Sequence, residues 1–98
     1  MNSDEPTYET AVSRLEEIIR RLDSGDAGLR LDRRTRMMYD DRHVFINGES
    51  FRAAGRDARL MRELADARRL AAPKCARLSG DAQAVVADWV AQGWAHDE

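Results

Sequence analysis

The sequence has only one cysteine, Cys75, only two prolines, and a single lysine among its 16 basic residues. One cysteine excludes an internal disulfide framework and any zinc site built from several thiolates. There is no run of about 18 apolar residues, so we predict no transmembrane helix. Residues 1–6 are acidic and lack an apolar stretch, which argues against a secretory signal. These absences are typical of a cytoplasmic protein, and no membrane partner is expected.

Charge is unevenly distributed along the 98 residues, although the net charge is only −2. Residues 31–69 contain ten arginines and seven acids, a local charge of +3, whereas the stretches on either side are acidic. A basic stretch attracts phosphate backbones, but the interspersed acids also predict an ordinary solvated surface, which we favour. The pI of 5.7 supports that interpretation, because the basic stripes of DNA-binding proteins usually raise it well above this value. If the stretch binds nucleic acid, the candidate contacts are Arg33, Arg34, Arg36, Arg52, Arg56, Arg59 and Arg62.

An amphipathic helix is predicted for residues 7–24, after a flexible N-terminus of residues 1–6. Apolar residues from Tyr8 to Leu22 recur at steps of three and four, which is the helical period, and Gly25 can end the helix. An apolar stripe of this kind must be covered. The covering surface is the rest of this chain, a second copy of it, or another protein. The candidate partner-binding residues on the stripe are Leu15, Ile18, Ile19 and Leu22.

Residues 25–34 contain two glycines and several turn-forming residues, and we interpret them as a linker. A three-stranded antiparallel meander is predicted next, over residues 36–52. Its strongest signal is Asn47-Gly48 between two β-rich runs, because both positions of such a hairpin turn need a positive φ. The alternation of a strand places Val44 and Ile46 on one face, and His43 and Phe45 on the other.

Three helices and a short extended tail complete the predicted order. They are a helix over about 56–69 with Leu60, Met61, Leu64 and Ala67 inward, a short helix from Pro73 to about Leu78, and a helix over about 80–92 capped by Ser79. The tail, Trp94 to His96, can pair with the edge of the meander. The predicted fold class is α+β, with a leading helix and a winged-helix-like domain over residues 35–98.

Residues 33–52, with the run Phe-Ile-Asn-Gly-Glu, and residues 89–94, Trp-Val-Ala-Gln-Gly-Trp, resemble the C-terminal module of bacterial JmjC/cupin ribosomal oxygenases. The resemblance covers residues 29–98 and implies a winged-helix fold. The catalysis of that family needs an iron held by two histidines and one carboxylate, and that site lies in a barrel which this chain lacks. No His-x-Asp pair is present, so the resemblance carries over no iron ligand.

Residues 7–30, with a leading aromatic residue, Leu-Glu-Glu-Ile and a closing Ser-Gly, resemble the first helix of the exonuclease VII small subunit. That resemblance implies a helix that binds and supports a separate catalytic subunit. The second long helix of that family is missing here. The two resemblances meet near residues 28–30, as in a chimera, whether a natural fusion or a recombined chain.

The sequence therefore predicts a non-catalytic interaction or assembly module that buries its helical stripe against a protein partner or a second copy. The alternatives are an accessory protein like the exonuclease VII small subunit and a winged helix that binds nucleic acid. No catalytic residue, metal ligand or cofactor is predicted. His43 and His96 are interpreted as structural or exposed side chains, and Cys75 as a packing residue, because no nucleophile and base stand in a recognisable pattern.

Overall fold

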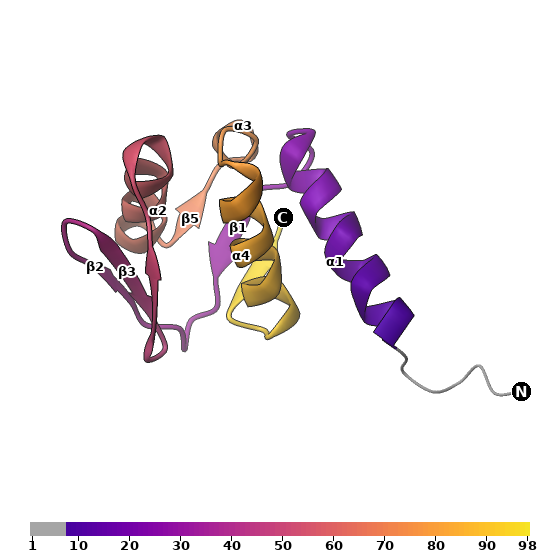
Figure 1. Ribbon diagram of the computed structural model, residues 1–98, viewed down its shortest axis with the longest axis horizontal. Helices are drawn as coiled ribbons and strands as arrows, with labels where there is room; N and C mark the ends of the chain where they lie inside the picture. Colours follow the sequence, from indigo (N-terminus) through magenta and orange to yellow (C-terminus); the bar gives the residue numbers. More distant parts are fainter. Residues whose placement is uncertain (1–7) are drawn as a thin grey trace, which may run out of the picture.

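The computed structural model describes residues 8–98, with side chains from Arg14 onward, so the N-terminus predicted to be flexible lies outside the described part. The helices are α1 (Tyr8–Asp23), α2 (Gly55–Ala67), α3 (Ala72–Cys75) and α4 (Gly80–Ala91). The strands are β1 (Leu29–Leu31), β2 (Met37–Tyr39), β3 (His43–Ile46), β4 (Glu49–Arg52), β5 (Arg69–Leu70) and β6 (Ala95–Asp97). They form two antiparallel sheets with strand orders β5-β1-β6 and β2-β3-β4 (Figure 1), which confirms the predicted α+β class.

The meander of β2, β3 and β4 is present as predicted. Asn47 and Gly48 form its second turn with φ angles of 49° and 89°, the left-handed conformations that this turn demands. Val44 and Ile46 are buried, while His43 and Phe45 on the opposite face are half-buried. The buried face packs on α2, which satisfies the need of a small sheet for a covering layer.

The second sheet differs from the prediction, because its central strand lies in the predicted linker. β1 pairs with β5 on one side and with β6 on the other, and its Leu29 and Leu31 are buried. The expectation that the C-terminal tail pairs with the meander is wrong, since β6 pairs with β1 instead. Strands of two or three residues are too short to show a hydrophobic alternation, and their partners here are far apart in the sequence.

Helices α2 and α4 largely agree with the prediction, whereas α3 ends at Cys75, earlier than the predicted end near Leu78. Ser79 caps α4 by accepting a hydrogen bond from the Ala82 amide, and Leu64 of α2 is fully buried. Ala67, predicted to face inward, is exposed, because α2 ends there and the chain turns at Arg68 with a φ of 64°. Trp89 of α4 is the largest fully buried side chain, and its ring meets the Phe51 ring of β4 edge to face, with 5.7 Å between the ring centroids.

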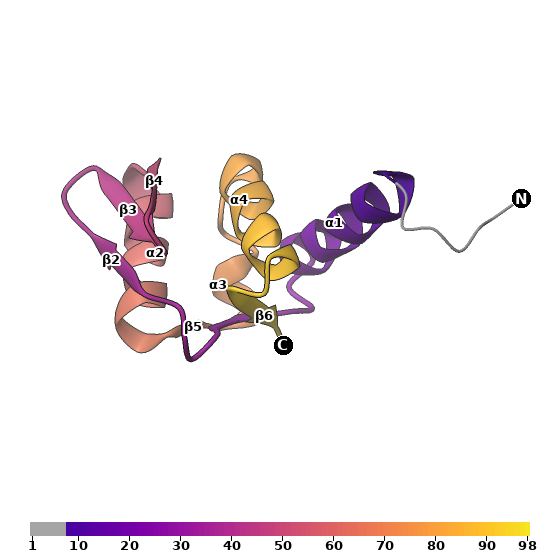
Figure 2. The same cartoon turned by 90° about the horizontal axis from the view of Figure 1, so that it is seen from below.

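Helix α1 docks on the rest of the chain. It packs against α4 and α3, and Gly25 ends it with a φ of 81°. Figures 1 and 2 show the meander and α2 at one end of the molecule, α1 at the other, and α4 between them. No helix in residues 8–98 combines the length and the apolar character needed to cross a membrane.

Candidate interaction surfaces

The apolar stripe of α1 is used largely within the chain. Ile18 and Leu22 are 3% and 0% exposed and belong to the core that also contains Val86 and Trp89 of α4. Leu15 and Ile19 are only partly buried against that core. Of the four residues predicted to bind a partner, two are therefore covered in this conformation, and two keep some accessible surface.

Helices α3 and α4, joined by residues 76–79, form a helix-turn-helix beside the sheet of β5, β1 and β6. In winged helices that read DNA, the second helix of such a pair lies in the major groove. Here that helix is α4, which packs against α1 and contains no lysine or arginine. Its charged side chains are the acids Asp81 and Asp88, which repel phosphate. The exposed face of α4 is thus acidic and offers no cation to a phosphate.

The arginines predicted to contact nucleic acid lie on other elements. Arg52 ends β4, and Arg56, Arg59 and Arg62 lie on α2. Another group occupies the loop between β1 and β2, namely Arg33, Arg34 and Arg36. All are exposed except Arg62, which is half-buried. The structure brings Arg52 and Arg62 to one cleft, whereas the loop group does not line it.

This feature, which we call the arginine cleft, has a volume of about 490 Å³. It lies between the β2–β3 turn, the end of β4 and the start of α2, and its lining residues are Asp41, Arg42, Arg52, Ala53, Ala54, Gly55, Ala58 and Arg62. Sequence reasoning missed Arg42, which lies in the β2–β3 turn. The main-chain bond from the Ala53 amide to the Arg42 carbonyl oxygen, 3.1 Å long, joins this turn to the end of β4.

Arg62 is held in place at the cleft wall. Its Nη2 donates to the Asp41 carbonyl oxygen at 3.3 Å, and its guanidinium lies 5.8 Å from the centre of the Tyr39 ring. The Tyr39 hydroxyl in turn donates to the Asp66 carboxylate at 3.0 Å, and this bond raises the pKa of Tyr39 above its usual value. The aromatic ring is therefore a fixed support for one cation of the cleft.

The other cations of the cleft keep their charge uncompensated. Arg42 and Arg52 form no ion pair among residues 14–98, whereas Arg21 of α1, Arg30 of β1 and Arg69 of β5 each pair with Asp97 or Glu98. Three arginines against the one carboxylate of Asp41 leave the cleft basic.

An apolar groove adjoins the arginine cleft and shares Arg52, Ala53 and Ala54 with it. The groove has a volume of about 240 Å³ and runs between β4 and α4. Its apolar lining comes from Val44, Phe51, Met61, Ala82 and Val85, and its acidic lining from Asp57 and Asp81. Asp57 accepts hydrogen bonds from the amide and the hydroxyl of Ser79, so that carboxylate is engaged in fastening α2 to α4.

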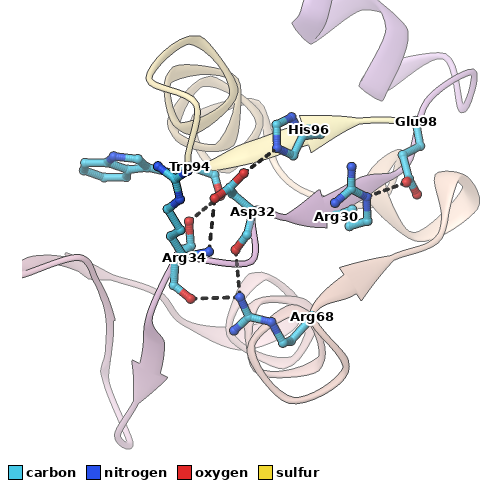
Figure 3. A network of polar contacts seen from close by, with 8 residues as sticks. Arg30, Asp32, Arg34, Arg68, Trp94, His96 and Glu98 are labelled. Atoms are coloured by element: carbon cyan, nitrogen blue, oxygen red, sulfur yellow. Dashed lines mark hydrogen bonds and ion pairs between the residues drawn. The ribbon is translucent and has the colours of Figure 1, made fainter.

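A network of polar contacts fixes the loop after β1 (Figure 3). His96 Nε2 lies 2.9 Å from Asp32 Oδ1, and this bond, with the Arg34 amide, holds the pKa of Asp32 below its usual value. Arg68 Nη2 donates to the carbonyl oxygens of Asp32 and Thr35, each at 2.8 Å. His96 is thus a structural residue of the β1–β6 sheet.

The remaining candidate groups show no catalytic arrangement. His43 lies 3.5 Å from Asp40 and packs near Phe45 on the outer face of the meander. Cys75 is buried, and this burial raises the pKa of its thiol to about 11, which keeps the sulfur protonated and unreactive. Within residues 8–98, no group of three histidine, cysteine or acidic side chains is placed to hold a metal ion.

Comparison with known proteins identifies a matching family model. A family model described as "ROXA-like winged helix" matches residues 3–96, whereas no curated protein and no solved structure matches the chain. The match confirms the predicted resemblance to the winged-helix module of ribosomal oxygenases. It also includes α1 and runs through residues 28–30, where the two resemblances were expected to meet.

Proposed function

This chain belongs to the ROXA-like winged helix family, and from that premise we propose that it is a non-catalytic module for protein interaction. Its helix-turn-helix serves as the scaffold that presents other surfaces, and it does not read DNA. Protein contacts are made from the end of the molecule formed by the meander and α2.

The observation that carries this proposal is the position of α1. Ile18 and Leu22 are buried where α1 packs against α4, so the chain itself covers one face of the helix that would enter a major groove. The charged residues on the exposed face of α4 are two acids, and the helix contains no lysine or arginine. Moving α1 away from α4 would expose the side chains of Ile18 and Leu22 to water. By contrast, the meander and α2 present an open cleft, uncompensated arginines and exposed large apolar side chains, of which Met38 is 66% exposed.

We keep the association role predicted for α1 only for the part of its surface that the rest of the chain does not cover. Leu15 and Ile19 keep accessible area, and a second copy or a nuclease subunit would have to bind there. Co-expression with an exonuclease VII large subunit tests the accessory hypothesis. Copurification that is lost in Leu15→Asp would support it, and no copurification would remove it.

A DNA-binding measurement tests the proposed function directly. We expect fluorescence anisotropy with a labelled duplex to show, at physiological salt, nothing tighter than ordinary non-specific binding, with Kd of about 10⁻⁵ M. The matched variant is the double substitution Arg56→Gln and Arg59→Gln, on the exposed face of α2. Tight duplex binding that this variant abolishes would contradict the proposal and favour the nucleic-acid alternative.

A further inference from the structure

We propose that the arginine cleft and the adjoining apolar groove together bind an acidic protein segment that carries a bulky apolar side chain. The inference rests on the proposed function, since it names the partner of the same end of the molecule. Carboxylates of the segment pair with Arg42, Arg52 and Arg62, and the apolar side chain enters the groove between β4 and α4.

The charge of the cleft selects an anionic partner. A guanidinium binds a carboxylate through two parallel hydrogen bonds, and Arg42 and Arg52 have no acid partner in the described part of the chain. Arg62 is already oriented by the Asp41 carbonyl oxygen and the Tyr39 ring, so little side-chain freedom is lost when it binds. Gly55, the first residue of α2, also lines the cleft, and Ala54 before it provides no side-chain cap.

The groove selects an apolar side chain beside the carboxylates. Its walls are Phe51 on one side and Val85 on the other, and both are only partly buried, so a partner can still cover them. Its volume of about 240 Å³ is below that of a typical small-molecule pocket and suits one large side chain. Arg52 lines both features, which places a charged contact directly beside the apolar one.

The acids around both features argue against a nucleic acid in this place. Asp41 lines the cleft, and Asp57 and Asp81 line the groove. A phosphate backbone brings a regular row of negative charges past all three, and their repulsion opposes each cation contact. A peptide can place its carboxylates at the arginines alone and its apolar side chain against Phe51, so the mixed pattern fits a protein segment.

The test uses the full chain and fluorescein-labelled oligomers of a random glutamate–tyrosine copolymer, titrated by anisotropy at low salt. We expect saturable binding that Arg52→Gln weakens about tenfold, the loss typical of one charge-assisted contact. The matched control is Arg20→Gln, an exposed arginine on α1 at the other end of the molecule, which should change the Kd less than about twofold. Polyglutamate should bind more weakly than the copolymer, because it leaves the groove empty. Val85→Gln should remove that difference, and unchanged melting temperatures show that the variants are folded.

Each outcome decides the matter. If the copolymer does not bind, or if Arg20→Gln weakens binding as much as Arg52→Gln, the acidic-segment site is wrong. If the copolymer does not bind and the labelled duplex also shows no tight binding, only the acidic-segment site is contradicted and the proposed function stands. If the duplex binds tightly through the α2 arginines, both are wrong, and the cleft belongs to a nucleic-acid surface.

Discussion

Replacement of Leu22 by alanine tests the docking of α1, on which the proposed function depends. Leu22 is 0% exposed and lies in the core with Val86 and Trp89. Leucine-to-alanine changes at fully buried sites cost about 3 kcal/mol, because apolar contact is lost and a cavity remains. For a domain of this size each kcal/mol lowers the melting temperature by about 4–8 °C, so the expected shift is roughly 12–24 °C.

Thermal and urea unfolding followed by far-ultraviolet circular dichroism measure this cost. Two controls lie on the same helix. Glu17→Ala removes an exposed side chain and should change the free energy of unfolding by less than about 0.5 kcal/mol. Ile19→Ala removes a partly buried side chain. Its change in the free energy of unfolding should lie between those of Leu22→Ala and Glu17→Ala.

A small effect of Leu22→Ala would refute the reasoning. If its free energy of unfolding stayed within about 0.5 kcal/mol of the parent protein, α1 would not be docked in solution. The face of α4 that α1 covers would then be open, and one argument against DNA reading by the helix-turn-helix would be lost.

Three further predictions concern single sites. The pKa of Asp32 is lowered in the folded state, so its contribution to stability is present above the unfolded pKa and is lost as the pH falls. Asp32→Asn should therefore destabilise the protein at neutral pH, with a deficit in urea titrations that shrinks below about pH 4; a constant deficit would disprove this. Cys75, with its pKa raised to about 11, should react with Ellman's reagent only after denaturation, and rapid labelling of the native protein would contradict its burial. In Gly28→Ala the new Cβ would lie 2.7 Å from the Leu70 carbonyl oxygen, so we expect a clear drop in melting temperature, whereas Gly80→Ala meets open space and should melt like the parent; equal melting of the two variants would disprove the close approach.

Periodic patterns and turn chemistry were sufficient to predict α1, the meander and α4 from the sequence. Helical spacing over 16 residues and the Asn-Gly turn are local signals, and the structure realises both. The strands β1 and β5 have three and two residues, and they exist only because distant segments meet to pair their main chains. No local pattern could have revealed them.

The candidate site was predictable only in part, for a related reason. The sequence marks Arg52 and Arg62 as basic, but the cleft arises because the chain joins Arg42 to the end of β4 through the Ala53 amide. Likewise, amphipathicity predicts that α1 must be covered, and it does not identify the covering surface. That the surface is α4 follows from tertiary packing alone.

Ion pairs join the N-terminal third of the chain to the rest of the fold, and arginines at the meander end stay outside them. β1 is the central strand of its sheet, and the Arg21–Asp97 and Arg30–Glu98 pairs join the N-terminal third to β6 and the C-terminal residue. A segment tied in this way belongs to the folded unit, which agrees with a family match that begins at residue 3. Those pairs engage Arg21 and Arg30, whereas Arg42 and Arg52 at the meander end have no acid partner among residues 14–98. Because exposed ion pairs contribute little to stability, leaving these arginines unpaired costs the fold almost nothing, and their positive charge stays available for a partner.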